Sequence, residues 1–474
     1  MKKKNRWKRQ KFISITVLLS GIALIVAAVL ISAAVAGKRV AKQAESVESA
    51  VEEDADVTLE DGNEAAAPDR EDSDDLTGEG GTAAMMPEEE IAAGTGTDAE
   101  GSEYADEEGA DDTDGQIVTD SSEDELAAEA DRIVSQMSED EKLCQMFFIT
   151  PEQLTGADTV TAAGDATKSA YEKKPVGGLI YFAKNLTDPD QTKKMLANTL
   201  QYAQDISGLP VFLGVDEEGG RIARVAENST FGVTKVGAAC DMKTEEEAGN
   251  AGLTIGTYLS ELGFNVDFAP DADVLTNPEN KVISDRSFGS DSGTVQKLAK
   301  AYSDGLHEAG IRSCYKHFPG HGGTGGDTHD GFAASDRTAE ELRAQELVPF
   351  QNAASDGAEF VMAAHISLPK ILSDNTPCSL SEEMLTGILR QECGYEGIII
   401  TDALNMGAIS KNYGAGEAAV MAVEAGADML LMPADFQAAY EALGQAVESG
   451  RITQDRVDAS VKRIVLAKLK MRQS

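Results

Sequence analysis

The chain has 474 residues, of which 42% are hydrophobic and 26% are charged. Its 41 basic and 82 acidic side chains give a formal net charge of -41, which disfavours a nucleic-acid partner because phosphate backbones would be repelled. The five cysteines are scattered, odd in number and without a CxxC spacing. A disulfide scaffold and a zinc knuckle are therefore not expected.

The first 36 residues predict a membrane anchor. Residues 1–11 are densely basic, and residues 12–36 carry no charge, which is long enough to span a bilayer. A cleaved signal peptide is the alternative, since residues 33–37 are small, but the apolar run exceeds the roughly 15 residues of a signal-peptide core. We therefore expect an uncleaved transmembrane signal-anchor at 12–36, with the basic segment 1–11 in the cytoplasm and the remainder extracellular.

Residues 37–122 predict a disordered acidic linker. Between residues 43 and 130 the chain carries 32 acidic side chains and a single basic one, Arg70. Such a segment buries too little apolar surface to offset its ordering entropy, and its charges repel one another. A cation-binding or partner-binding tail is the alternative. We expect the folded domain to occupy residues 123–474.

From residue 123 onwards, apolar runs alternate with amphipathic segments. Two initial helices are expected at 121–137 and 138–148. Seven later runs have the composition of buried strands, namely 177–182, 210–216, 266–274, 311–317, 360–365, 397–402 and 428–432. Parallel strands need helical crossovers, so this pattern favours an α/β fold of the (β/α)8 TIM-barrel type over an open doubly wound sheet. One strand of the eight is expected to be irregular or missing.

Polar side chains stand at the carboxyl ends of most of these runs. In chain order they are Asp216, Asp271, Lys316, His317, His365 and Asp402. Barrel enzymes place their active sites on this face, so the distribution indicates an enzyme. Asp402 follows a buried run and can act as a nucleophile, although capping the next helix is an equally good local explanation.

Residues 316–329 read KHFPGHGGTGGDTH and contain three of the five histidines. Asp327 can accept the N–H of His329, fix its tautomer and leave the other ring nitrogen free for proton transfer. His317 and His321 are spaced like zinc ligands, but the proline and glycine between them exclude the usual helix. The sequence predicts an acid–base pair and no metal site. The glycine-rich run lacks the ending of a phosphate-binding loop, so no nucleotide is expected.

Together these segments resemble the glycoside hydrolase family 3 β-N-acetylglucosaminidases, also called β-N-acetylhexosaminidases. The resemblance covers residues 125–474 through MSEDEKLCQM, VDEEGGRIAR, FAPDADV, DRSFG, KHFPGHG, the D-x-H pair and TDALNMGAI. It implies that Asp402 is the catalytic nucleophile, that His329 is the general acid/base and that Asp327 orients His329. No metal or other cofactor is implied. It assigns binding of the terminal sugar and its 2-acetamido group to Asp216, Arg224, Arg286, Lys316 and His317.

The implied activity is that of a retaining exo-glycosidase, which removes terminal non-reducing β-linked GlcNAc by double displacement. The expected extracellular position suggests peptidoglycan-derived or other cell-wall glycans as the carbohydrate substrate. A β-glucosidase or a β-GlcNAc phosphorylase of the same family is the enzymatic alternative, because a neutral histidine would not repel phosphate. A catalytically silent glycan-binding protein is the alternative from another class. Because the chain stops at Ser474, we expect one catalytic domain.

Overall fold

The computed structural model describes residues 114–325 and 333–472. The expected anchor at 12–36, the greater part of the expected linker, and both Asp327 and His329 lie outside the described residues. Among the helices of the described ranges, none combines the length and apolar character needed to cross a membrane.

Two helices precede the first strand. Helix α2 (Asp114–Gln136) begins ahead of residue 123, where the folded domain was expected to start. Leu126 and Ile133 of α2 pack against the core, and helix extension from such an anchored segment adds one hydrogen bond per residue. Helix α3 (Glu139–Gln145) begins at Ser138, whose side chain forms a capping box with Glu141.

Eight short strands pair in parallel. They are β1 (Phe147–Ile149), β2 (Gly178–Ile180), β3 (Phe212–Val215), β6 (Val266–Asp267), β7 (Cys314–Phe318), β9 (Phe360–Ala363), β11 (Ile398–Thr401) and β12 (Leu430–Leu431). One sheet has the order β12-β1-β2-β3-β6 and another the order β11-β9-β7. Parallel bridges from Val266 to Arg312 and from Ile400 to Met429 join the two sheets at both sides. The pairing follows chain order around a ring, which is consistent with a (β/α)8 barrel.

Strand β1 is the one that the sequence did not reveal. Its three residues follow α3 almost directly, and the apolar Phe147 and Phe148 continue the helical pattern of 138–145. The expectation that the second helix extends to 148 is therefore wrong, and no strand of the ring is missing. Its pairing with both β12 and β2 supplies the tertiary hydrogen bonds that override the local pattern.

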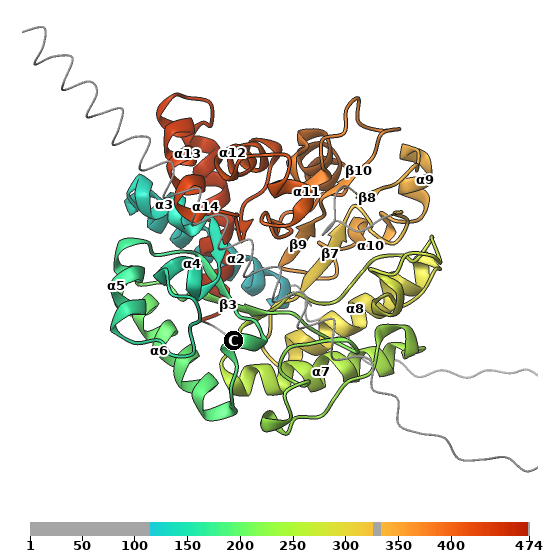
Figure 1. The fold of residues 1–474 in the computed structure, drawn as a ribbon, viewed down its shortest axis with the longest axis horizontal. Helices are drawn as coiled ribbons and strands as arrows, with labels where there is room; N and C mark the ends of the chain where they lie inside the picture. Colours follow the sequence, from blue (N-terminus) through green and yellow to red (C-terminus); the bar gives the residue numbers. More distant parts are fainter. Residues whose placement is uncertain (1–113, 326–332, 473–474) are drawn as a thin grey trace, which may run out of the picture. The chain divides into compact units, whose positions relative to one another are not determined.

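Helical segments lie around the strands in Figure 1 and provide the crossovers. They are α4 (Pro151–Thr155), α5 (Asp165–Lys173), α6 (Pro189–Ser207), α7 (Glu245–Leu262), α8 (Ser292–Glu308), α9 (Ala339–Ala344), α10 (Val348–Gln351), the π-helix η6 (Glu383–Glu392), α11 (Gly407–Ser410), α12 (Ala415–Ala425), α13 (Phe436–Glu448) and α14 (Gln454–Lys470). Two small pairs, β4 (Glu217–Gly219) with β5 (Ile222–Ala223) and β8 (Ala333–Ala334) with β10 (Ile366–Ser367), lie in the loops.

Aromatic rings fill the space between the strands. Phe148 stacks on Phe212 with ring centroids 6.4 Å apart and meets Phe268 edge-on at 5.1 Å. A Cβ at Gly178 would lie 2.5 Å from the Phe148 ring, and one at Gly214 would lie 2.8 Å from it. The glycines of β2 and β3 therefore make room for a large ring from β1, and the interior is a packed core.

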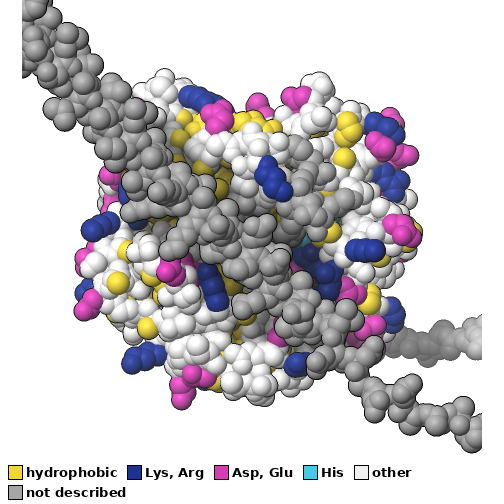
Figure 2. Space-filling model, viewed as in Figure 1, with side chains coloured by type: hydrophobic (Ala, Val, Ile, Leu, Met, Phe, Trp, Pro, Cys, Tyr) yellow, Lys and Arg dark blue, Asp and Glu magenta, His cyan; other side chains and the backbone are white. Residues whose placement is uncertain are grey.

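Charged side chains of both signs are interspersed around the edge of the face shown in Figure 2. Among the described residues of this edge, acidic groups stand beside basic ones, which reduces the local field of each. An extended anionic polymer would therefore meet mixed charge along this edge.

Candidate active site

A pocket of about 480 Å³ lies where the strands end at their carboxyl side. Every predicted site residue within the described part of the chain lines it: Asp216, Arg224, Arg286, Lys316, His317 and Asp402. Asp216 follows β3, Lys316 and His317 belong to β7, and Asp402 follows β11. Thus the fold brings together side chains that are up to 186 residues apart in the sequence (402 minus 216).

Buried ion pairs hold two of the cations of the pocket, Lys316 and Arg286. Lys316 Nζ lies 2.9 Å from Asp216 Oδ1 and 2.5 Å from Glu218 Oε1. The Arg286 guanidinium binds both oxygens of Glu218, each at 2.8 Å. Burial alone would raise the pKa of Glu218, but Arg286 and Lys316 outweigh it and lower that pKa. Glu218 is therefore ionised and fixes both cations.

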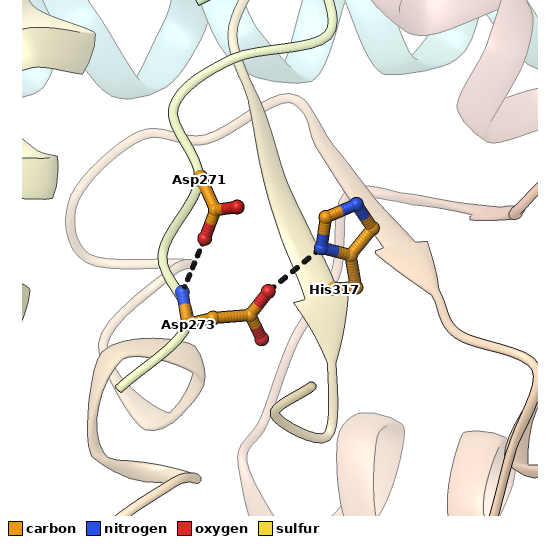
Figure 3. A group of neighbouring side chains, drawn as sticks. All are labelled: Asp271, Asp273 and His317. Carbon is orange, nitrogen blue, oxygen red and sulfur yellow. Dashed lines mark hydrogen bonds and ion pairs between the residues drawn. The ribbon is translucent and has the colours of Figure 1, made fainter. Parts of the chain in front are cut away.

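A second chain of contacts orients His317 (Figure 3). Its Nδ1 lies 2.7 Å from Asp273 Oδ2. Its Nε2 lies 3.3 Å from Arg286 Nη2. Asp271 Oδ1 in turn accepts a hydrogen bond from the Asp273 backbone at 3.0 Å. Burial, assisted by the charge of Arg286, lowers the pKa of His317 to about 4. The neutral ring therefore donates Nδ1–H to Asp273 and accepts from Arg286 at Nε2.

One group in the described residues has the spacing of a metal site. Ligand atoms of Asp271, Asp273 and His317 all lie within 4.8 Å of one another. However, Arg286 Nε lies 3.4 Å from Asp271 Oδ2, and both Asp273 and His317 are engaged in hydrogen bonds. A divalent cation would have to displace the guanidinium, so the arrangement fits a hydrogen-bonded ion-pair network better than a metal site.

Asp402 lies on the other side of this network. Its Oδ1 accepts the Ala403 N–H at 2.7 Å. Burial would raise the pKa of Asp402, but His365, His317, the Ala403 N–H and Lys316 together lower it. Burial also lowers the pKa of both histidines, so that they are neutral at neutral pH. The hydrogen bond from the Ala403 N–H and the more distant charge of Lys316 are then what keeps Asp402 ionised.

The local alternative for Asp402, that it caps the next helix, is not observed. Helix α11 begins at Gly407, and its N-cap residue is Met406. The turn after Asp402 is held instead by His365, whose Nε2 lies 3.0 Å from the Ala403 carbonyl and whose Nδ1 lies 2.7 Å from Ser379 Oγ. The carboxylate is thus left to face the pocket.

Apolar side chains line the remaining wall of the pocket. They are Ile180, Phe182, Ile222, Val282, Met362, Ala403, Met406, Leu431 and Met432. Met432 has φ 46°, one of two positive-φ non-glycine residues in the described chain; the other is Ser284, with φ 44°, two residues before Arg286. Such conformations cost about 1–3 kcal/mol and cluster at functional sites. Met432 lines this pocket, and Ser284 lies in the chain between Val282 and Arg286, which also line it.

Four further residues contribute to the site through contacts that the sequence did not predict: Glu218, Asp273, His321 and His365. The signal for Glu218 was present in the DEEGG segment, and that for Asp273 in FAPDADV. Neither segment shows which cation or ring its carboxylate meets. His321 was considered only as a metal ligand.

The matching family model is the glycosyl hydrolase family 3 N-terminal domain, which aligns with residues 138–467. The chain belongs to this family, in agreement with the resemblance found in its motifs. The matched range includes all eight strands of the ring and the pocket described above.

Named relatives and solved structures agree with this family. The chain is 36% identical to β-hexosaminidase A of Pseudoalteromonas piscicida over 63% of this chain and 54% of that protein. It is 36% identical to the β-hexosaminidase LpqI of Mycobacterium tuberculosis over 55% of this chain and 68% of the relative. A family 3 β-N-acetylglucosaminidase from Paenibacillus sp. FPU-7 superposes with a TM-score of 0.66 at 38% identity, covering 71% and 63% of the two chains. The chain thus spans about half to two thirds of these proteins.

Proposed function

We propose that this protein is a retaining exo-β-N-acetylglucosaminidase that hydrolyses terminal non-reducing β-linked GlcNAc. The observation that carries the proposal is an ionised Asp402 facing a pocket whose opposite wall holds Lys316, Arg286 and His317 in fixed positions. The relatives named as β-hexosaminidases support the same activity. Nothing in this mechanism calls for a metal or an organic cofactor.

In the first step, an oxygen of Asp402 bonds to the anomeric carbon as the bond from that carbon to the leaving oxygen breaks. His329, oriented by Asp327, gives its proton to the leaving oxygen. In the second step His329 takes a proton from water, whose oxygen bonds to the anomeric carbon and releases Asp402. The roles of His329 and Asp327 rest on the sequence, since both lie outside the described residues.

The sugar is bound by the charged wall. Asp216 and Lys316, joined at 2.9 Å, offer an acceptor and a donor to neighbouring hydroxyl groups. Arg224 lines the pocket with its Nε buried and without a hydrogen-bond partner, so a substrate oxygen can satisfy part of its guanidinium. Arg286 and His317 complete the site. Because two of its cations are paired with Asp216 and Glu218, the site suits an uncharged sugar.

We infer the position of the enzyme from its sequence. Residues 12–36 anchor the chain in the cell membrane with residues 1–11 in the cytoplasm, and the acidic segment 37–122 separates the anchor from an extracellular catalytic domain. The ring of parallel pairs supports treating residues 123–474 as one (β/α)8 TIM-type barrel. This placement favours peptidoglycan-derived or other cell-wall glycans as substrates.

The test uses the purified full chain in detergent and a panel of aryl glycosides. We expect release from aryl β-GlcNAc to exceed that from aryl β-glucoside, no requirement for phosphate, and β-GlcNAc as the first product seen by NMR. A preference for the glucoside would favour a β-glucosidase, and a phosphorylated product would favour a phosphorylase. Formation of the α-anomer first would contradict retention.

Removal of the nucleophile has the largest expected effect on turnover. Asp402→Ala should lower kcat by at least about 10³-fold because the covalent intermediate cannot form. Asp285→Asn, at an exposed ion pair with Arg221, is the matched control and should remain near wild type. Wild-type turnover by the Asp402 variant would refute its role, and binding of GlcNAc without turnover by the unaltered chain would support a silent glycan-binding protein.

A further inference from the structure

His321 carries a buried nitrogen that the proposed mechanism does not use. Its Nε2 is one of six side-chain atoms in the described chain that are buried without a hydrogen-bond partner. The residue is 2% exposed, and it lines the same pocket as Asp402. Buried polar atoms are nearly always satisfied in folded proteins, so this atom can take its partner from a group that enters the pocket.

The other polar atoms of His321 are already satisfied. Nδ1 lies 3.0 Å from Thr324 Oγ1, and the backbone N–H donates to Asp273 Oδ1. The backbone carbonyl accepts from Asn280 Nδ2 at 2.8 Å. Rotating the ring to satisfy Nε2 would break the Thr324 contact, so the protein itself offers no simple alternative.

Close packing holds the backbone on both sides of the ring. A Cβ at Gly322 would lie 2.1 Å from the Val274 carbonyl oxygen, and one at Gly320 would lie 2.5 Å from the Glu346 Cβ. The ring itself meets His317 edge-on, with centroids 5.9 Å apart. Nε2 is therefore in place before a ligand arrives, which reduces the ordering cost of binding.

Asp273 links the two histidines. It accepts the Nδ1–H of His317, as Figure 3 shows, and the backbone N–H of His321. Burial lowers the pKa of His321, so the ring is neutral at neutral pH. A neutral imidazole presents one nitrogen as a donor and the other as an acceptor. A hydroxyl group can pair with Nε2 in either case, since it both donates and accepts.

We propose that His321 is a further substrate-binding residue, whose Nε2 forms a direct hydrogen bond with a hydroxyl group of the sugar in the pocket. The proposal rests on the proposed function, because it requires that a sugar occupies this pocket. It extends the binding wall beyond Lys316 and His317 along the same segment of the chain.

Two substitutions separate substrate binding from a structural role. In His321→Gln the amide reaches the position of Nε2 and loses the contact with Thr324, whereas in His321→Asn it replaces Nδ1 and leaves the position of Nε2 empty. We expect His321→Asn to lower kcat/KM for aryl β-GlcNAc about tenfold or more, mainly through KM, with unchanged thermal unfolding. His321→Gln should retain more activity than His321→Asn despite a lower unfolding temperature.

The reverse order of activities would overturn the proposal, because it would show that only the Thr324 contact matters. A wild-type KM in His321→Asn would overturn it as well. His307→Asn is the control: its Nε2 contacts Glu359 at 2.9 Å, outside the residues that line the pocket, and KM should not change.

Failure of the proposed hydrolase function can be distinguished from failure of the proposed role of His321. If the unaltered chain cleaves none of the glycosides, calorimetric titration with free GlcNAc and glucose replaces the kinetic assay. Weaker sugar binding by His321→Asn than by His321→Gln would then support the role of Nε2 without the hydrolase activity. Equal affinities in both variants, or no sugar binding by the unaltered chain, would refute it.

Discussion

The two walls of the pocket are built on different principles. Over β3, β6 and β7, charged side chains bind one another in a continuous network that runs from Asp216 through Lys316, Glu218 and Arg286 to His317. Over β9, β12 and β2, the lining is apolar and rich in methionine. The first wall has fixed geometry, because each group is held by a charge-assisted hydrogen bond. The second wall is shaped by packing alone.

Asp402 is a charged residue within the apolar wall, and its role as a nucleophile gives a reason for the difference between the two walls. It follows β11, so its neighbours in the ring are β9, which contributes Met362, and β12, which contributes Leu431. Within the described part of the apolar wall it is the single carboxylate of the pocket lining. A nucleophile needs an ionised carboxylate that is not neutralised by a direct ion pair. The charge of Lys316 lowers the pKa of Asp402 from a distance, and the Ala403 N–H donates to its Oδ1, so that Oδ2 can attack.

Removal of Glu218, the carboxylate that Lys316 and Arg286 share, should disrupt the whole charged wall. Glu218→Gln leaves Lys316 and Arg286 buried without their common carboxylate, which should cost about 3 kcal/mol of unfolding free energy. Displacement of both cations should also lower kcat/KM about 100-fold. Urea unfolding and steady-state kinetics measure the two effects.

The control for that substitution is an exposed ion pair. Glu392 binds Arg343 through two hydrogen bonds at 2.6 and 2.9 Å, but both side chains are more than a third exposed. Glu392→Gln should therefore cost less than about 1 kcal/mol and leave kinetics unchanged. Equal losses of stability in the two variants would show that the buried network has no special role.

A smaller effect is expected from the pH dependence of the charged wall. Burial and the neighbouring Asp273 raise the pKa of Asp271 to about 7. Its unfolded pKa is about 3.9, so between about pH 4 and pH 7 the folded protein retains a proton that the unfolded chain has lost. The contribution of Asp271 to the unfolding free energy therefore decreases over this range as pH rises.

Asp271→Asn cannot ionise and removes that contribution. The unfolding free energy of the variant, relative to wild type, should increase between about pH 4 and pH 7, as measured by urea unfolding at intervals of pH. Asp285→Asn serves again as the exposed control. A difference between Asp271→Asn and wild type that stays constant, or decreases with pH, contradicts the raised pKa.

The sequence predicted the fold well where the strands are apolar runs that differ in composition from the segments on either side. All seven expected runs contain or overlap a strand, because buried parallel strands are continuous apolar segments bounded by turns. It failed at β1, since three residues directly after a helix carry no boundary signal. Helix α2 also begins before residue 123, since a polar stretch gives little indication in the sequence of where a helix starts.

The same limit applies to the site. The side chains that end strands could be predicted, because strand ends converge on one face of a barrel. Their partners could not, since Glu218 and Arg286 are 68 residues apart, and Asp273 and His317 are 44 apart. Only the folded ring shows that these pairs meet. It also shows that His365 holds the turn at Ala403 and that Asp402 does not cap the next helix.

The apolar wall gives the smallest and most specific test. Met432→Ala and Met432→Gly both delete the side chain, so both should raise KM for aryl β-GlcNAc by a similar factor of about two to five. Their stabilities should differ, because glycine adopts φ 46° without strain and alanine does not. We expect the glycine variant to be more stable than the alanine variant by about 1 kcal/mol.

Met362 provides the comparison within the same wall. It lines the pocket from β9, where its backbone is part of a regular parallel ladder. At that position glycine should be less stable than alanine by about 1 kcal/mol, since only the entropy of the unfolded chain differs. Opposite orders at 362 and 432 would establish that the backbone of Met432 is strained, whereas the same order at both would show that it is not, and that the apolar wall owes the position of Met432 to packing alone.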